Sequence, residues 1–382
     1  MERYPLIGSF LMLVLLGTVY GGCYDLTDCY TCTSQTGYFS WPCMWCPLSD
    51  TCHTYGSWYS PCRSSFAARN SSTCDLLPPP TTDSYNQTLA VQLASWSSLA
   101  YVKPGEIDPE VLRNVLESEL PGGYRMLKYL QKYCDILVEY SACSLLVAIS
   151  DLERNIIVSF EGTQNIDQLF EQLTSAIVTG LESTEIGGKV LYYNYNVHQL
   201  LYPCLQKYLR ELLANNPGYR LTLTGHSLGG AQAQLAAAAL IYDGVTTNEK
   251  LEVYSFGAPR FGDADFANHF NNLVRHNWRL VQATDPVPRI PPYFVYHTHE
   301  EVWFSEPGIT PSSNYTICQV NEDEACALSQ SSHTCFSEDC VEVHKNYFLD
   351  IGSKYAEGKL AGDSTPSLST YGTCDSVDFS DN

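Results

Sequence analysis

Ser227 stands in a sequence that is typical of a catalytic nucleophile, Gly225-His226-Ser227-Leu228-Gly229-Gly230. The preceding residues, Tyr219 to Thr224, predict a buried strand, and the alanine-rich residues Ala231 to Tyr242 predict a helix. A G-x-S-x-G motif between a strand and a helix exposes the serine hydroxyl on a strained turn, and the helix N-terminus favours a developing negative charge. The alternative interpretation is a glycine-rich turn without chemistry.

A serine hydroxyl needs a general base, and that base needs an orienting acid. Asp285 is the best candidate for the acid, because it follows a predicted strand, Trp278 to Ala283, at the sheet edge where Ser227 should also emerge. Asp263 and Asp265 are rivals, but they precede a helical stretch, where capping of the helix is the more ordinary role.

Several histidines could serve as the base. In the chain order serine, acid, histidine, His344 comes last and follows a long cysteine-rich loop. The position of His344 makes it the best of several candidates and no more. The other histidines considered are His226, His269, His276, His297, His299 and His333.

Composition limits the classes of partner. The chain has 382 residues, of which 45% are hydrophobic, and 42 carboxylates against 21 Lys and Arg give a net charge of -21. Such an acidic protein is a poor partner for nucleic acids and for anionic membranes, whereas a neutral substrate is compatible with it.

The N-terminus predicts secretion. Residues 1–22 have the pattern of a signal peptide, with an apolar run too short to span a membrane comfortably, and no later stretch is a better candidate for a span. The 16 cysteines suit an oxidising compartment. Three sequons, at Asn70, Asn86 and Asn314, are predicted glycosylation sites.

Residues 23–76 predict a small cysteine-rich module, followed by a Pro/Thr-rich linker at residues 77–88. The pairs Cys29/Cys32 and Cys43/Cys46 could form zinc knuckles, but behind a signal peptide disulfides are favoured. The cysteine spacing around Trp45 resembles the PSI (plexin-semaphorin-integrin) module, which implies a spacer or docking role.

Residues 89–360 predict an α/β domain, and residues 361–382 form a C-terminal tail. Alternating strands and helices favour a mostly parallel sheet covered on both faces. The expected elements are a helix at 89–101, a hairpin of 145–149 and 156–160, a helix at 199–214, and strands at 251–256, 278–283, 293–297 and 301–304.

Several separated segments of residues 85–360 together resemble the class 3 (fungal-type, triacylglycerol) lipase family of α/β-hydrolases. They are Val158 to Thr163, Val197-His198, Gly225 to Gly230, Phe256 to Arg260, Asp285 to Pro292, His297 to Trp303, and His344-x-x-Tyr347. The resemblance implies an α/β-hydrolase with a mostly parallel central sheet, here preceded by a small disulfide-rich module.

The resemblance also implies residue roles. Ser227 would be the nucleophile, Asp285 the acid and His344 the base, while the N–H of Leu228 and Thr163 would stabilise the oxyanion. His297 would be structural, and neither a metal nor an organic cofactor is implied.

Three positions depart from the family pattern. Glu161 stands where the family usually has Arg, Val343 where it has Asp, and Gln199 to Leu201 replace a V-H-x-G-F continuation. The first departure changes the charge beside the oxyanion loop and the second removes a carboxylate next to His344. None of them removes a member of the triad.

The segment after Thr163 predicts an amphipathic helix, with Ile166, Leu169, Phe170 and Leu173 at i, i+3, i+4 and i+7. An ordinary surface helix is the alternative. In the resembling family this segment is a mobile lid over the acyl pocket, which implies a lipid ester bound at a lipid–water interface.

The sequence therefore predicts a secreted serine hydrolase of lipid esters, of the triacylglycerol type. A phospholipase or a non-lipid carboxylesterase is the alternative within the enzymes. A non-catalytic adhesion or binding protein is the rival from another class. The sequence does not predict the oligomeric state.

Overall fold

The structure is a computed structural model, and the residues it describes fall in two compact units, 1–74 and 75–382. The described residues are 22–37, 40–46, 49–57, 74, 85–102, 109–134, 142–163, 180–291, 294–318, 321–323, 326–330, 338–352, 354–355 and 377–378.

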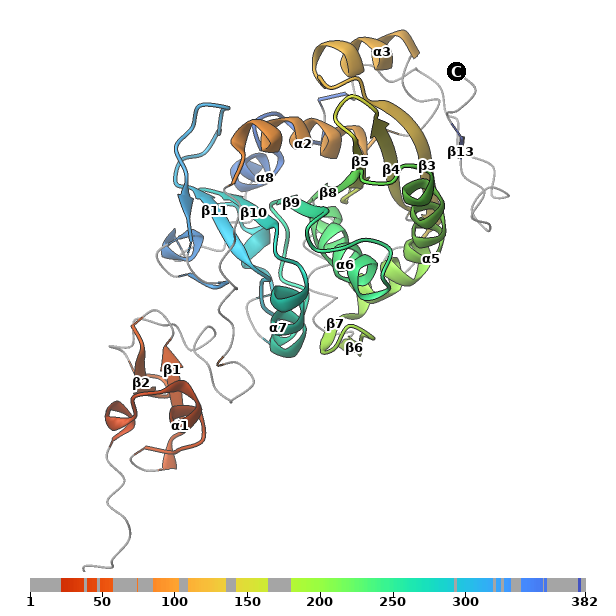
Figure 1. Ribbon diagram of the computed structural model, residues 1–382. Coiled ribbons are helices and arrows are strands. Elements are labelled where there is room, and N and C mark those ends of the chain that lie inside the picture. Colours follow the sequence, from red (N-terminus) through yellow and green to blue (C-terminus); the bar gives the residue numbers. More distant parts are fainter. Residues whose placement is uncertain are drawn as a thin grey trace, which may run out of the picture. The chain divides into compact units, whose positions relative to one another are not determined.

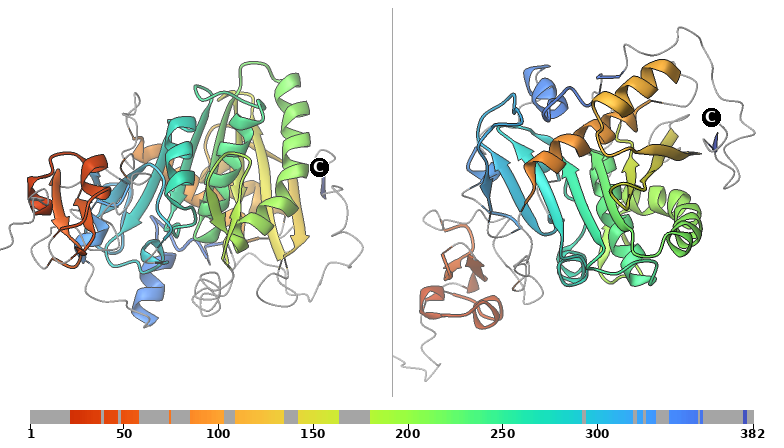
Figure 2. Two further views of the ribbon diagram at one scale, coloured as in Figure 1. Left: turned by 90° about the horizontal axis from the view of Figure 1, so that it is seen from below. Right: turned by 45° about the horizontal axis from the view of Figure 1, so that its top comes forward.

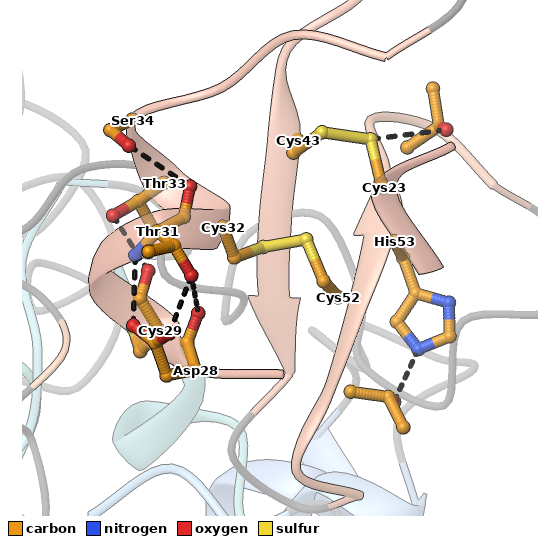
Figure 3. The surroundings of a disulfide bond; sticks show 12 residues. Cys23, Asp28, Cys29, Thr31, Cys32, Thr33, Ser34, Cys43, Cys52 and His53 are labelled. Atoms are coloured by element: carbon orange, nitrogen blue, oxygen red, sulfur yellow. Dashed lines mark hydrogen bonds between the residues drawn. A yellow bond between two sulfur atoms is a disulfide. The ribbon is translucent and has the colours of Figure 1, made fainter. Parts of the chain in front are cut away.

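The first unit is a small module whose main buried cluster consists of five cysteines and Trp45. It contains η1 (Cys23–Asp25), α1 (Cys29–Thr33), β1 (Cys43–Cys46) and β2 (Thr51–Thr54), and the two strands pair antiparallel. Disulfides join Cys23 to Cys43, Cys32 to Cys52 and Cys29 to Cys74. Figure 3 shows the first two of these bonds fastening η1 and α1 to the strands. The prediction of disulfides in place of zinc is confirmed.

A sheet of nine strands forms the centre of the second unit among the described residues, in the order β12-β11-β10-β9-β8-β5-β4-β3-β13. Strands β5, β8, β9, β10 and β11 run parallel, and the outer pairs are antiparallel. The strands are β3 (Arg125–Tyr133), β4 (Ala142–Ser150), β5 (Asn155–Phe160), β8 (Arg220–His226), β9 (Leu251–Phe256), β10 (Asn277–Gln282), β11 (Glu300–Phe304), β12 (Thr316–Ile317) and β13 (Val377–Asp378).

Two hydrophobic cores lie on opposite faces of this sheet. Successive residues of β4 alternate between them, so Leu145 packs in one core and Leu146 in the other, as the period of two in a strand requires. Helix α2 (Gln87–Leu99) crosses one face, and α5 (Tyr192–Asn215), α6 (Leu228–Tyr242) and α7 (Ala264–Leu273) cover the other (Figures 1 and 2). The predicted α/β fold with a largely parallel central sheet is confirmed.

Helix α6 is buried over nearly its whole length. Every residue from Leu228 to Leu240 is buried, and the helix contacts β5, β8, β9, α5 and α7. Alanine and glycine make this possible, because short side chains let the helix axis approach the sheet and its neighbours closely. The helix that follows Ser227 is therefore a fixed support for it.

The remaining elements of the second unit are short. They are α3 (Pro109–Ser118), the hairpin of β6 (Leu181–Ser183) and β7 (Lys189–Leu191), the turns η4 (Val287–Arg289) and η5 (Ala327–Gln330), and α8 (Glu338–Lys345). No helix among the described residues is both long enough and apolar enough to cross a lipid bilayer.

One predicted strand is wrong. Of the segment Tyr293 to His297, the described residues form no strand, and only an isolated bridge joins Tyr296 to Gly262. The backbone here has other partners, because the N–H of His297 donates to the Glu322 carboxylate. A run of apolar residues cannot reveal that its hydrogen bonds go to a side chain.

Candidate active site

Ser227 lies at the turn between β8 and α6, in a strained backbone conformation. Its φ is 58° and its ψ is -130°, values that a side chain-bearing residue rarely adopts, and it is the N-cap of α6. The turn closes tightly, since a Cβ on Gly230 would lie 3.0 Å from the Ser255 side chain. The backbone N–H of Ser227 donates to the carbonyl of Phe256 at the end of β9.

Asp285 and His344 form a buried pair at the same edge of the sheet. The Nδ1 atom of His344 lies 3.0 Å from both carboxylate oxygens of Asp285, and neither side chain is exposed. Asp285 also accepts the N–H of Val287 at 3.0 Å and the hydroxyl of Tyr347 at 2.5 Å. Three donors therefore fix the carboxylate in one orientation.

The Tyr347 hydroxyl donates to Asp285 and accepts the backbone N–H of Gln282 at 3.3 Å. Burial, and then the neighbouring Asp285 carboxylate, raise its pKa well above the ordinary value. The phenol therefore keeps its proton at neutral pH and donates a hydrogen bond to the Asp285 carboxylate.

The acid and the base are brought together by β10 and α8. Gln282, the last residue of β10, donates its side-chain amide to the carbonyls of Val343 and Asn346, on either side of His344. Gly257 packs against the pair, since a Cβ there would lie 2.8 Å from the Asp285 carboxylate and 3.0 Å from the His344 ring. Its φ of 59° also suits glycine.

Ser227 Oγ and His344 Nε2 are among the buried side-chain atoms of the described residues that have no hydrogen-bond partner. Because Nδ1 of His344 is hydrogen-bonded to Asp285, Nε2 of His344 is the ring nitrogen that remains available for proton transfer. Buried polar groups without partners are uncommon in folded proteins and often mark sites of chemistry.

His226 links the nucleophile segment to the base segment. Its Nε2 lies 2.8 Å from the carbonyl of His344, its Nδ1 lies 2.9 Å from the Tyr101 hydroxyl, and its ring lies 4.5 Å from that of His344. Burial, and then the neighbouring His344, hold the pKa of His226 well below its usual range. His226 is therefore neutral, donates through Nε2 and accepts through Nδ1, which leaves neither nitrogen for acid–base work.

Thr163 and Leu228, the residues predicted to bind the oxyanion, lie in segments that flank the nucleophile turn. Phe160 pairs with Gly225 in the β5–β8 ladder, so the residues that follow β5 run beside the nucleophile turn. Leu228 is the first residue of α6, and its N–H therefore has no acceptor within the helix. The carboxylate of Glu161 accepts the Ser144 hydroxyl.

Other residues singled out from the sequence lie away from the Ser227–His344 site or outside the described residues. Asp263 caps α7 by accepting the N–H of Phe266 at 2.8 Å, so its predicted capping role is confirmed. Asn86 and Asn314 are exposed, and Asn86 caps α2 by accepting the N–H of Leu89. The positions outside the described residues are Asn70, Ile166, Leu169, Phe170, Leu173 and His333.

Some members of the site had not been assigned roles from the sequence. Tyr347 and Gly257 stood in recognised motifs, and Gln282 and Tyr101 in predicted elements, but none of the four had a predicted role in the site. A glycine directly after a predicted strand was the one available signal. The contacts of the other three depend on segments far apart in the chain.

The described residues contain two groups whose atoms are close enough to hold a metal ion, Cys23/Cys43/Cys52 and Glu301/Cys318/Cys326. All five of these cysteines are in disulfides, so they cannot act as thiolate ligands.

The fold is that of an α/β-hydrolase. Its defining features are the parallel strands, the strained serine between a strand and a helix, and the buried acid–histidine pair at the carboxyl ends of the strands. Solved structures of the same fold agree with this. The triacylglyceride lipase of Rhizomucor miehei has a TM-score of 0.58 at 22% identity, covering 72% of this chain and 98% of that one. A Penicillium cyclopium structure has a TM-score of 0.55 at 19% identity, covering 71% and 99%.

Residues 157–295 match the model of the lipase (class 3) family, and the resemblance to that family is confirmed. A Caenorhabditis elegans lipase is 28% identical over 294 residues, which cover 69% of this chain and 79% of that protein. A secreted mono- and diacylglycerol lipase of Fusarium solani is 39% identical over 140 residues, which cover 36% of this chain and 40% of its own length.

Proposed function

We propose that this protein is a secreted serine hydrolase that cleaves carboxylic esters of lipids through an acyl-enzyme on Ser227. The observation that carries the proposal is the pair of unpartnered buried atoms, Ser227 Oγ and His344 Nε2, with the other ring nitrogen of His344 bonded to Asp285. The membership of residues 157–295 in the class 3 lipase family supports it.

In the proposed mechanism, Ser227 Oγ attacks the ester carbonyl carbon while His344 Nε2 takes its proton. Asp285 holds the ring and stabilises the imidazolium. The N–H of Leu228 and Thr163 stabilise the oxyanion of the tetrahedral intermediate. His344 then protonates the leaving alcohol, and water, activated by the same histidine, releases the fatty acid.

The nature of the substrate is proposed from the apolar surroundings and from the relatives. Leu228, Val287 and Ile290 form a small buried hydrophobic cluster with Tyr193 directly beside the nucleophile and the acid. Apolar side chains of this kind are the usual contacts of a hydrocarbon chain in a binding site. The relatives are named as mono- and diacylglycerol lipases and as a triacylglyceride lipase. A phospholipase or a carboxylesterase on other acyl groups is the alternative.

The first test is covalent labelling with a serine-reactive fluorophosphonate. The wild-type protein should be labelled at one site and should hydrolyse esters, whereas Ser227→Ala should fold, resist labelling and lose activity by several orders of magnitude. A folded wild-type protein that is neither labelled nor active would support the non-catalytic binding protein instead. Phospholipid and triglyceride emulsions, compared with a soluble ester, separate the enzyme alternatives.

The second test concerns the proposed lid, residues 164–173. A lid with an apolar underside should open where that face meets lipid, because the open state then has the higher affinity. Activity on an insoluble ester should therefore rise steeply above its solubility limit. Replacing Leu169 and Phe170 by Ser should lower this activity by about tenfold and spare a short soluble ester. Equal losses on both substrates would mean that the segment has a structural role.

We also propose the arrangement of the whole chain. Residues 1–22 are a signal peptide, 23–76 a PSI-like module, 77–88 a linker, 89–360 the hydrolase domain and 361–382 a tail. Asn70, Asn86 and Asn314 carry glycans. The secreted lipases among the relatives support export. Mass spectrometry of the exported protein, before and after removal of N-glycans, tests the signal cleavage and all three sites.

A further inference from the structure

A buried ion pair lies next to the loop that carries Asp285. The Nε and Nη2 atoms of Arg260 each donate to one carboxylate oxygen of Glu322, both at 2.8 Å. The two side chains are only 1% and 6% exposed. A two-pronged pair of this kind fixes direction as well as distance, because the guanidinium is planar and its donors are rigidly placed.

The pair holds the loop, residues 285–291, at three of its carbonyl groups. Arg260 donates its backbone N–H to Ile290 at 3.0 Å and its Nη1 to Pro291 at 3.2 Å. Glu322 accepts the N–H of His297 at 2.8 Å, and the Nε2 of His297 lies 2.7 Å from the carbonyl of Pro288. The segment from Pro288 to Pro291 is therefore fixed by hydrogen bonds from Arg260 directly and from Glu322 through His297.

His297 is a donor in this arrangement. Burial, and then the neighbouring Arg279 and Arg260, hold its pKa well below the usual range. The ring is neutral and carries one proton, and the carbonyl of Pro288 can only accept. Its contact with the loop is thus a hydrogen bond from Nε2–H.

Glu322 is itself held firmly. It lies in the loop closed by the Cys318–Cys326 disulfide, and the neighbouring Asn321 is bonded on three sides. The Asn321 carbonyl accepts Arg279 Nη2, its side chain donates to the carbonyl of His297, and it also accepts from the amide of Asn271. The disulfide loop therefore presents the Glu322 carboxylate to Arg260 from a fixed position.

We infer that Glu322 is a positioning residue for the catalytic acid, acting through Arg260 and His297 on the loop that carries Asp285. This inference rests on the proposed role of Asp285. Proton transfer by His344 requires Asp285 to stay within hydrogen-bond reach of Nδ1, and the turn from Asp285 to Val287 is continuous with the held carbonyls. An error of about 1 Å in such a site can cost 100-fold in rate.

The test compares Glu322→Gln with Glu301→Gln in the full-length protein. Glu301 pairs with Arg279 at 3.5 Å in the same buried region but makes no hydrogen bond to residues 285–291. Each variant breaks one buried pair, so both should unfold at a lower temperature. Only Glu322→Gln should lower kcat on a short soluble ester, by about 10- to 100-fold, with KM changed less than about twofold.

The rate of phosphonate labelling, normalised to folded protein, should fall by the same factor as kcat in Glu322→Gln. Equal kcat values in the two variants would show that the pair only stabilises the fold, and would overturn the inference. If Glu322→Gln does not fold, Arg260→Lys replaces it, since lysine keeps the charge but loses the fork and the bond to Pro291. A wild-type protein without activity would instead refute the proposed function.

Discussion

At the scale of single residues, the site depends on donors that keep each catalytic group in one state. Asp285 accepts from His344, Tyr347 and Val287, and His226 is fully occupied by Tyr101 and His344. His344 therefore has one free nitrogen and one orientation. The hydrogen-bond partners of these histidines therefore determine that His344, and not His226, can act as the base.

Gly257 allows a direct test of this packing. Gly257→Ala should lower kcat by roughly 100-fold, because its Cβ would collide with the Asp285 carboxylate and the His344 ring. The control is Gly244→Ala, whose φ of 64° is equally unfavourable for alanine but whose Cβ would meet nothing within 4 Å. Both changes should destabilise the protein by about 1–2 kcal/mol.

The measurements for this pair are kcat on a soluble ester and the free energy of unfolding in urea. Similar losses of activity in the two variants would mean that the backbone strain, and not the collision with the pair, is responsible.

At the scale of elements, α6 and the parallel strands around it determine where Ser227 lies. Strands β8, β9 and β10 end side by side, so Ser227, Gly257 and Asp285 follow neighbouring strands at one edge. Helix α6 is enclosed on all sides, which ties the nucleophile to the core. A displacement of α6 would therefore be transmitted to the site.

Overpacking of α6 should reveal this connection. Ala237 is completely buried, and Ala237→Leu should destabilise the protein by about 1–3 kcal/mol by forcing neighbours apart. Tyr242→Leu, at a position 53% exposed on the same helix, should change stability by less than about 0.5 kcal/mol. Thermal unfolding of the two variants is the measurement, and equal melting temperatures would contradict the tight packing of α6.

The sequence predicted the elements whose pattern is local. The strand before Ser227, the helix after it and the hairpin of β4 and β5 are confirmed, because their apolar periodicity or glycine signals lie within a few residues. The strand at 293–297 was wrong and the Arg260–Glu322 pair was missed for the same reason. Both depend on a carboxylate from a loop more than 20 residues further along the chain, and no local pattern encodes that.

At the scale of the whole molecule, several buried histidines are neutral in the folded state. Burial, and then the neighbouring Arg279 and His276, lower the pKa of His299 to about 3, and the pKa values of His226 and His297 are also well below the usual range. In the unfolded chain a histidine titrates near pH 6.5. Below that pH the unfolded state binds protons that the folded state cannot.

Stability should therefore be retained above about pH 6.5 and should fall as the pH is lowered toward 4.5. His299→Asn should reduce the slope of melting temperature against pH in this range, because one differential proton is removed. Asparagine tolerates the φ of 54° at this position, so the backbone can be kept. An unchanged slope in the variant would show that His299 does not contribute to the acid sensitivity.

The distribution of the disulfides between the two units affects which fragments stay linked after the backbone is cleaved. Each of the five bonds whose two cysteines are described joins residues of the same unit, three within residues 1–74 and two, Cys134–Cys143 and Cys318–Cys326, within residues 75–382. A protease that cuts the backbone between Cys74 and Tyr85 would leave these five crosslinks intact and none of them bridging the two fragments. With respect to these five bonds, the first unit could be exchanged, duplicated or lost without breaking a disulfide of the second unit.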